Sequence, residues 1–499
     1  MLKLLTSNQI QDADKYIIKN KFHISVDLME EAANAFVAAF ISYLPNRNKS
    51  ITVYCGSGNN GGDGLAIARL LFQEGYKNLQ VKIAWFNEGY TDDFNINLDR
   101  LNDIDVSVEI FETLDTDTFT ENSEIIIDGL LGSGLSRPLA GEWEELVKLL
   151  NSLNRRVVSI DIPTGLRSEG ILSPIDTVIH SDLTICFQRP KINFFFPECA
   201  EALQNFKIVQ IGLDEDFIQA LKSCWELVED SDIKSLIKSR KRFTHKGTYG
   251  HALIVAGSKE TMGAALLAAD ACLHAGAGLT SAFIPEAGLT SLNSRQPEVM
   301  AVLRENFNFF DFHSLDKYQS IAVGPGIGKE NSTIALVYYL LDNYKSAMVL
   351  DADALNILAE NRAWLKLVPP NSILTPHMKE FDRLFGDHSS TWERIETAKI
   401  KAAEYQIIIL LKNQYSFIVF PDGRVRINST GNPAMAVGGM GDVLTGIIAA
   451  FLAQGYSSEN AVTIACYLHG LAGDLLKTKG GMSIIPPRYI IKYLPKIIG

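Results

Sequence analysis

Short runs of consecutive hydrophobic residues, each closed by glycine or polar residues, recur in two long parts of the chain. In the first part the runs lie at residues 51–56, 81–86, 124–132, 156–165 and 182–187. In the second part they lie at residues 251–258, 320–328, 347–355, 371–377 and 407–412. Hydrophobicity that is continuous along a strand, instead of alternating, is typical of parallel sheets covered on both faces. The pattern therefore predicts two α/β sheets.

Helical patterns accompany these strands. Two helices are predicted before the first strand, one after Ser7 and one at residues 25–44 with Ser25 as its N-cap. The last third of the chain predicts two long helices, at residues 436–455 and 457–480. Strands that alternate with helices are typical of βαβ units.

The segment at residues 212–244 separates the two strand-rich parts. It is rich in charged residues and lacks a strand pattern, so we expect a linker with one or two helices. A chain of 499 residues also exceeds the size at which a single core stops growing, about 250–300 residues. Two α/β domains are therefore predicted, at residues 1–215 and 225–499. The first is expected to be a Rossmann-like three-layer αβα domain.

The formal charge of −12, from 46 basic and 58 acidic residues, argues against binding to nucleic acid or to an anionic membrane. An anionic ligand must then be held by local groups, and backbone amides at helix N-termini are suited to that task. The six cysteines are scattered without metal-ligand spacing, which favours reduced thiols and a cytoplasmic protein. No segment reaches the roughly 18 apolar residues of a membrane span.

Three loops of the first domain carry candidate chemistry. The segment GSGNNGGDG at residues 56–64 lies between a predicted strand and a helix, where glycines let backbone amides approach a ligand. The loops DGLLGSGLSRP (128–138) and DIPTGL (161–166) each begin with an aspartate at the end of a strand. Each aspartate alone is equally well explained as a turn former. Because strand ends meet at one edge of a doubly wound sheet, the three loops together predict a binding site.

These loops resemble those of NAD(P)H-hydrate epimerases, and the resemblance covers residues 1–215. It implies a potassium ion held by Asn60, Asp128 and Thr164, whose oxygen atoms suit a hard cation. It implies substrate contacts from Asn59, Asn60, Gly61, Gly62, Asp63, Gly132, Ser133, Gly134, Leu135, Ser136, Arg137, Pro138 and Asp161. Epimerisation at C6 of the hydrated nicotinamide ring needs proton transfer, for which we choose Asp161 as general acid and base. Lys191 is a second catalytic or phosphate-contacting candidate, and the alternative for it is a solvated surface lysine.

The segment NPAMAVGGMGDVLTG at residues 432–446 carries the sharpest signal of the second domain. Its glycines lead into an apolar helix that bears Asp442 at its start. Amides at this helix N-terminus would form an anion hole for a phosphoryl group, with Asp442 beside it as a base. The alternative for Asp442 is a carboxylate that only complements the helix dipole.

This helix start resembles the ribokinase-like superfamily. The segments at residues 243–258, 323–328, 350–356 and 374–386 narrow the resemblance to ADP/ATP-dependent NAD(P)H-hydrate dehydratases, over residues 225–499. The resemblance implies contacts to the hydrate from Ala264, Gly326, His377 and Asp442. It implies contacts to the adenine nucleotide from Lys412, Asn413, Gln414, Tyr415, Ser416 and Gly441. His377 alone is equally well explained as a hydrogen-bonded loop histidine.

Together the two resemblances imply a bifunctional enzyme of nicotinamide nucleotide repair. Its epimerase would interconvert the R and S hydrates NADHX and NADPHX. Its dehydratase would return the S epimer to NAD(P)H with ADP as phosphoryl donor, releasing AMP and phosphate, with ATP as the alternative donor and Mg²⁺ accompanying the nucleotide. The resemblance also implies a homo-oligomer. Two other functions stay open: a ribokinase-like small-molecule kinase, and a nucleotide-sensing scaffold without turnover.

Overall fold

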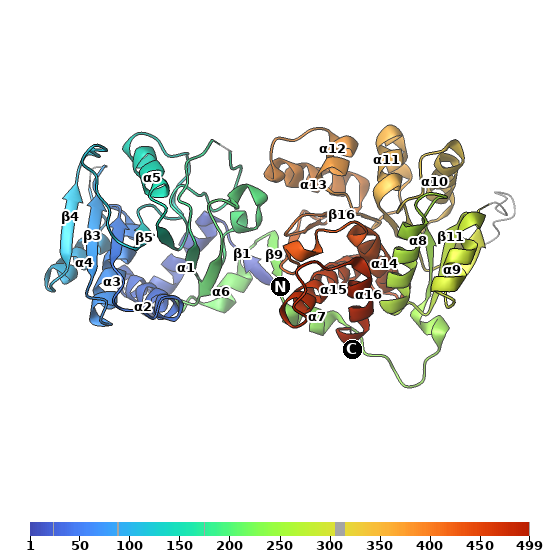
Figure 1. Cartoon of the computed structure of the whole chain (residues 1–499), viewed down its shortest axis with the longest axis horizontal. Coiled ribbons are helices and arrows are strands. Elements are labelled where there is room, and N and C mark those ends of the chain that lie inside the picture. The colour runs from blue at the N-terminus through green and yellow to red at the C-terminus, as the bar shows by residue number, and fades with distance from the viewer. Residues whose placement is uncertain (23, 87–88, 174, 305–314, 499) are drawn as a thin grey trace. The chain divides into compact units, whose positions relative to one another are not determined.

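The computed structural model describes residues 1–22, 24–86, 89–173, 175–304 and 315–498. Contacts between these residues divide the chain into two compact units. The N-terminal unit comprises Lys3–Ser223 and Ser390–Trp392, and the C-terminal unit comprises Met1–Leu2, Cys224–Ser389 and Glu393–Gly499. Figure 1 shows both units as α/β structures, as the hydrophobic pattern predicts.

The sheet of the N-terminal unit has the strand order β4-β3-β2-β5-β6-β7-β8. Its strands are β2 (Ile51–Cys55), β3 (Leu79–Ala84), β4 (Ser107–Phe111), β5 (Ile125–Gly129), β6 (Arg156–Ile160), β7 (Leu183–Phe187) and β8 (Phe206–Val209). Every neighbouring pair is parallel. The order reverses between β2 and β5, and ligands of doubly wound sheets bind at the carboxyl ends of strands beside such a reversal. The first two candidate loops follow these two strands.

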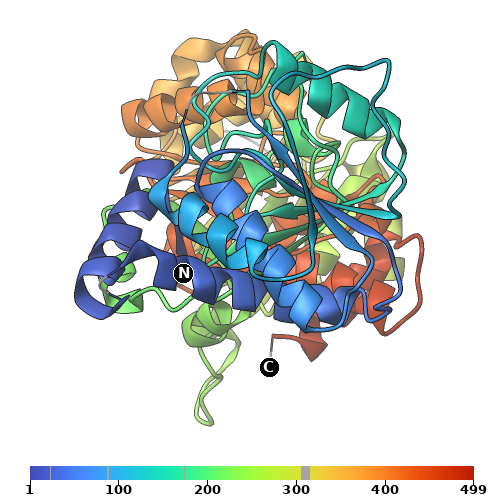
Figure 2. The same ribbon diagram turned by 90° about the vertical axis from the view of Figure 1, so that its left-hand side faces the viewer.

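Helices cover both faces of this sheet. They are α1 (Ser7–Ile17), α2 (Ser25–Tyr43), α3 (Asn59–Gln73), α4 (Asp92–Asn102), α5 (Glu142–Ser152) and α6 (Glu215–Ala220). One hydrophobic core joins α2 and α3 to the sheet, and a separate core joins α5 to it. Figure 2 shows the two groups of helices on opposite sides of the strands. The predicted three-layer αβα fold is therefore confirmed.

The expected N-cap at Ser25 is wrong. Ile24 is the N-cap of α2, and Ser25 is the first helical residue. The Ser25 hydroxyl donates to Asp93 Oδ1 at 2.7 Å instead of accepting from the backbone of its own helix.

The second sheet, whose strands from β9 onward belong to the C-terminal unit, has the order β1-β9-β18-β17-β16-β15-β14-β13-β10-β11-β12. Its strands are β1 (Leu2–Leu4), β9 (Trp225–Val228), β10 (His251–Val255), β11 (Leu279–Ile284), β12 (Met300–Leu303), β13 (Ser320–Val323), β14 (Met348–Leu350), β15 (Ile373–Leu374), β16 (Ile408–Leu411), β17 (Phe417–Val419) and β18 (Val425–Asn428). The strands from β12 to β16 are parallel to one another. Strand β17 runs antiparallel to both its neighbours. The carboxyl ends of the parallel strands again form one edge.

The helices of this unit form two groups, seen in Figure 1 on opposite sides of β16. One group is α10 (Asn331–Asn343), α11 (Ala352–Glu360), α12 (Met378–Phe385) and α13 (Thr391–Tyr405). The other is α8 (Met262–His274), α14 (Met440–Ala453), α15 (Ser458–Thr478) and α16 (Pro487–Tyr493). Two short helices are α7 (Asp230–Leu236) and α9 (Leu289–Arg295). No helix in the described ranges is long and apolar enough to cross a membrane.

Helix α14 is the central helix of its group. Every residue from Val443 to Ala453 is buried, which explains why its sequence is apolar all round. It packs closely against α8, because a Cβ added at Gly446 would lie 2.1 Å from the Ala268 carbonyl oxygen. A residue without a side chain is therefore required at position 446.

The expectation that residues 212–244 lack a strand is wrong. Helices α6 and α7 lie there as expected, but β9 lies between them and pairs parallel to β18. The strand is only four residues long, and Glu226 interrupts its hydrophobic residues, so the pattern gave no signal for it.

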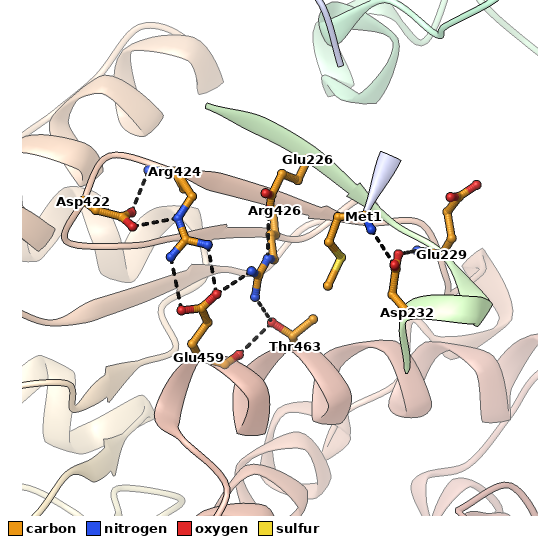
Figure 3. Close-up of polar contacts among 9 residues, drawn as sticks. All are labelled: Met1, Glu226, Glu229, Asp232, Asp422, Arg424, Arg426, Glu459 and Thr463. Carbon is orange, nitrogen blue, oxygen red and sulfur yellow. Dashed lines mark hydrogen bonds and ion pairs between the residues drawn. The ribbon is translucent and has the colours of Figure 1, made fainter. Parts of the chain in front are cut away.

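Charged side chains hold this edge of the sheet (Figure 3). On β18, Arg426 Nε donates to Glu226 Oε2 at 2.8 Å, and Arg426 also pairs with Glu459 at the start of α15. Arg424 donates to both carboxylate oxygens of Glu459, at 2.9 and 3.1 Å. Strand β9 is thus joined to its unit by side-chain ion pairs as well as by the sheet.

Candidate active sites

A cavity of about 500 Å³ lies at the carboxyl ends of the N-terminal unit's strands. Nine of the predicted residues line it: Asn59, Asn60, Asp63, Gly132, Ser133, Gly134, Leu135, Asp161 and Lys191. The structure therefore brings the three candidate loops together. Ser136, Arg137 and Pro138 do not line this cavity. Nor do Gly61 and Gly62, which pack against Gly56 and Met29.

Asp161 and Lys191 form an ion pair at this cavity. The Lys191 ammonium donates to Asp161 Oδ1 at 2.7 Å, and the Phe187 amide donates to the same oxygen at 3.0 Å. The lysine is only 1% exposed, so the alternative of a solvated surface lysine is wrong. Burial alone would lower the pKa of Lys191, because it favours the neutral amine. The charges of Asp161, Cys186 and Asp14 and the hydrogen bond to Asp161 together outweigh burial, so the pKa of Lys191 is raised. Asp161 also has a left-handed backbone with φ of 60°, which is uncommon for an aspartate.

A further carboxylate, that of Asp14, lines the same cavity from helix α1. Burial raises its pKa to about 6, with a further contribution from the charge of Asp161. Asp14 was not predicted from the sequence, because it lies in a helix and not in a loop that follows a strand. Its signal lay in helical spacing, since Asp14 shares a face of α1 with Ile10 and Ile17.

The predicted potassium ligands Asp128 and Thr164 are completely buried and in contact. Thr164 Oγ1 donates to Asp128 Oδ1 at 2.6 Å, and the Thr164 amide and the Ser159 hydroxyl donate to Oδ2. Burial raises the pKa of Asp128, and none of the described basic residues forms an ion pair with it. A buried carboxylate without a partner of opposite charge is stabilised by a bound cation.

Asn60 is the third predicted ligand, and its backbone carbonyl oxygen would lie 3.2 Å from a Cβ added at Gly129, the residue after Asp128. Its amide nitrogen is buried and has no hydrogen-bond partner among the described residues. A Cβ added at Gly132 would lie 3.3 Å from Asn60 Cγ, so the second loop packs against its side chain. Amide, carboxylate and hydroxyl oxygens are the donors that a hard cation prefers, and the residues present fit potassium. No cluster of three or more His, Cys, Asp or Glu side chains suited to a metal occurs in the described part of the chain.

A second cavity, of about 470 Å³, lies in the C-terminal unit. It is lined by five of the six residues predicted to contact the nucleotide: Lys412, Asn413, Gln414, Ser416 and Gly441. Tyr415 does not line it. Apolar side chains such as Met435 and Leu444 complete the lining, which suits the flat face of a nucleotide base.

The ion pair of Lys412 with Asp351 borders this cavity. Lys412 Nζ lies 2.7 Å from Asp351 Oδ1, and Thr445 Oγ1 donates to Asp351 Oδ2 at 2.7 Å. Asp351 is buried at the end of β14, so it joins the lysine that follows β16 to helix α14. A cation is thus fixed beside Gly441, whose added Cβ would lie 3.5 Å from Lys412 Nζ.

Asp442 lies in the first turn of α14 beside this pair. Burial raises its pKa to about 6, Asp351 raises it further, and Lys412 opposes the shift. Gly439 is the N-cap and has φ of 92°, a left-handed conformation that glycine adopts without strain. No side chain in the described ranges caps α14, so its first amides can bind an anion, next to a carboxylate whose pKa is about 6.

Ala264 and Gly326 are brought together, because a Cβ added at Gly326 would lie 3.1 Å from Ala264 Cβ. His377 is the N-cap of α12, and its Nδ1 accepts the Glu380 amide at 3.2 Å. Its backbone is paired with that of Lys412, while the side chain is 47% exposed. His377 is thus a hydrogen-bonded histidine at Nδ1, as the alternative interpretation held. Its other ring nitrogen, Nε2, lies 3.5 Å from Glu380 Oε1.

Both halves of the chain match known protein families. Residues 252–496 match the family model described as NAD(P)H-hydrate dehydratase, and residues 25–193 match the YjeF-related protein N-terminus. A bifunctional NAD(P)H-hydrate repair enzyme of Thermofilum pendens is 32% identical over 96% of this chain and 93% of its own length. This chain belongs to the family of bifunctional NAD(P)H-hydrate repair enzymes.

Other relatives agree with this family. A bifunctional NAD(P)H-hydrate repair enzyme of Moorella thermoacetica is 30% identical over 99% of this chain and 96% of its own length. A solved ribokinase-like superfamily protein of Enterococcus faecalis is 28% identical, with a TM-score of 0.51, over 56% of this chain and 96% of its own. The ribokinase-like fold predicted for the second half is thus confirmed. The match to the N-terminal family model begins after Asp14.

A buried histidine that was not predicted from the sequence also lines the second cavity. His469 on α15 lines the cavity, and its Nε2 is buried without a hydrogen-bond partner in the described ranges. Burial, with the charge of Lys412, lowers its pKa to about 4, so the ring is neutral at physiological pH. A histidine inside an apolar helix more often belongs to the core, which is why its sequence gave no signal.

Proposed function

We propose that the N-terminal unit interconverts the R and S hydrates of NADH and NADPH, and that the C-terminal unit dehydrates the S epimer with ADP. The products of the second reaction are NAD(P)H, AMP and phosphate. The observation that carries the proposal is a pair of cavities in separate units. Asp161 lines the first, and Asp442 follows Gly441 of the second, in a chain related to bifunctional repair enzymes over 96% of its length. Dehydration of only one epimer explains why an epimerase is fused to it.

In the dehydratase site, Asp442 removes the proton from the C6 hydroxyl of the S hydrate. The hydroxyl oxygen attacks the terminal phosphorus of ADP, and the bond from that phosphorus to the bridging oxygen breaks with AMP as leaving group. Phosphate then leaves C6 as a proton is lost from C5, which restores the dihydronicotinamide ring. Lys412 and the first amides of α14 stabilise charge on the transferring phosphoryl group.

Each substrate has its own set of proposed contacts in this unit. Ala264, Gly326, His377 and Asp442 contact the hydrate, and Lys412, Asn413, Gln414, Tyr415, Ser416 and Gly441 contact the nucleotide. Mg²⁺ typically binds through phosphates with only one or two carboxylates, so it needs no larger acidic cluster. Bound with the nucleotide, it would neutralise phosphate charge beside Asp351 and Asp442.

In the epimerase site, Asp161 carries protons to and from the substrate at C6. Lys191 holds the Asp161 carboxylate in a fixed position through the 2.7 Å contact. Asn59, Asp63 and the loop residues from Gly132 to Leu135 surround the hydrate in the cavity they line.

The proposal is tested by incubating a mixture of R and S NADH hydrate with the enzyme and either ADP or ATP. Both epimers are expected to disappear, as chromatography shows, while reduced-nicotinamide absorbance returns. Without nucleotide, the epimers should equilibrate without any return of absorbance. A small-molecule kinase would instead accumulate a stable phosphorylated product, and a sensor would leave the hydrates unchanged.

We also propose that potassium binds at Asn60, Asp128 and Thr164. The ion would neutralise the buried Asp128 carboxylate and fix the loops that contact the substrate. Replacing potassium by tetramethylammonium is expected to slow epimerisation, because a bulky cation cannot fill a site of buried oxygens. Dehydration of the purified S epimer should keep its rate.

The ligand role is checked with Asn60→Ala, using the exposed Asn48→Ala as control. The variant is expected to need at least about tenfold more potassium for half-maximal epimerisation, since even outer partners of metal sites contribute about 10–100-fold in affinity. An unchanged potassium dependence of Asn60→Ala would exclude this ligand set.

A further inference from the structure

The cavity of the N-terminal unit holds more negative than positive charge. Asp14, Asp63 and Asp161 line it, and Lys191 is paired with Asp161. The only other basic residue in its lining is Arg189, whose guanidinium pairs with Glu215. Three carboxylates close to one available cation cannot all be ionised without mutual repulsion. The groups most easily protonated are those with the fewest partners.

Asp63 and Asp14 both lack a hydrogen-bond or ion-pair partner among the described residues, and Asp14 reaches the cavity from helix α1. Asp161, in contrast, accepts from both Lys191 and the Phe187 amide. Asp14 is half-buried and projects from α1, an element outside the sheet, while Asp161 follows β6. The two carboxylates therefore reach one cavity from different elements.

We propose that Asp14 is a second acid–base group of the epimerase site, acting with Asp161 on opposite faces of the hydrate ring. The inference rests on the proposed epimerase function and adds a residue to it. The two carboxylates share one proton, so one acts as acid while the other acts as base.

The reaction then needs no other proton donor. Protonated Asp14 gives its proton to the C6 hydroxyl, the C6–O bond breaks with its electron pair on the departing water, and the N1 lone pair forms an N1=C6 double bond. Water adds to the other face of C6, the double-bond pair returns to N1, and the surplus proton of that water goes to Asp161. The reverse reaction starts with the proton on Asp161.

This arrangement sets the pH dependence of epimerisation. Burial raises the pKa of Asp14 to about 6, Asp161 adds to the rise and Lys191 opposes it. Burial raises the pKa of Asp63 most, and the charges of Asp161 and Asp14 raise it further. Because the active enzyme carries one proton on the pair, kcat/KM for either epimer should fall above about pH 6.

The experiment compares Asp14→Asn with wild type and with Asp12→Asn, an exposed carboxylate on the same helix. Asp14→Asn is expected to lose about 10²–10⁴-fold in epimerisation rate, the usual contribution of general acid–base catalysis. In Asp14→Asn, kcat/KM of the remaining epimerisation should no longer fall above about pH 6. Asp12→Asn should keep the pH profile of wild type. Dehydration of the S epimer, catalysed in the other unit, should be unchanged in both.

Thermal unfolding separates catalysis from structure. An ionised Asp14 is disfavoured in the folded state, so Asp14→Asn should unfold at the wild-type temperature or higher at pH 8. If wild type does not epimerise, the proposed function itself fails. If wild type epimerises and Asp14→Asn matches its rate and pH profile, the role of Asp14 is wrong. A slow variant with a lower unfolding temperature and an unchanged pH profile also overturns it.

Discussion

Asp442→Asn is expected to reduce dehydration of the S epimer by about 10²–10⁴-fold, the range that general base catalysis usually contributes. The amide keeps the size of the side chain but cannot accept the C6 hydroxyl proton. Nucleotide should still bind, because the residues lining its cavity are unchanged apart from their neighbour at 442. Epimerisation should proceed at the wild-type rate, since Asp442 belongs to the other unit. Two quantities are measured: the return of reduced-nicotinamide absorbance in the presence of ADP, and the amounts of the two epimers by chromatography.

Two further observations make this result specific. The exposed Asp342→Asn in the same unit serves as the matched control and should dehydrate normally. In wild type, kcat/KM for dehydration should rise with pH through about 6 and then level, because Asp442 must lose its proton to act as a base. Near-normal dehydration by Asp442→Asn would remove this residue from the mechanism and return the kinase to consideration.

Lys191→Met is expected to abolish epimerisation and to lower the free energy of unfolding of its unit by about 3–5 kcal/mol. The reason is that Asp161 would lose its cation while it remains beside Asp14 and Asp63. The folded-state pKa of Lys191 lies above its unfolded value. The contribution of the Lys191 charge to stability is therefore fully present below its unfolded pKa of about 10.4 and is lost only as pH rises through its higher folded-state pKa.

The stability loss should thus appear throughout the range from about pH 6 to 9, measured by urea unfolding of the full chain. Lys207→Met, which removes an exposed lysine of the same unit, should change neither stability nor epimerisation. Full epimerase activity in Lys191→Met would show that the fixed position of Asp161 is unnecessary. Dehydration of the S epimer serves as the internal control for folding of the C-terminal unit.

Continuous hydrophobic runs predicted ten of the parallel strands, because burial on both faces leaves a direct record in the sequence. The parallel strands β4, β8, β11 and β12 were not predicted. Strand β9 lacked that record, since Glu226 lies within it and pairs with Arg426 from a strand far along the chain. The antiparallel strand β17 was also not predicted, for a different reason. Its three residues follow β16 closely, so the two runs looked like a strand and its loop.

The candidate sites divide in the same way. Loops at strand ends predicted nine residues that line the first cavity, because the topology of parallel sheets gathers such loops at one edge. Asp14 and His469 come from helices, where only tertiary packing brings a side chain to the edge. The ion pair of Lys191 with Asp161 likewise depends on contact between residues 30 positions apart. No local pattern encodes such contacts.

The tight packing at Gly446 limits how this enzyme can be stabilised by design. Replacing a glycine inside a helix by alanine usually gains about 1 kcal/mol, and Gly446 looks like an ideal target on that rule. Here the new methyl group would collide with the Ala268 backbone and displace the helix that carries Asp442 one turn earlier. Thermostabilised variants should therefore keep glycine at this position, and libraries that vary it should lose dehydration before they lose the fold.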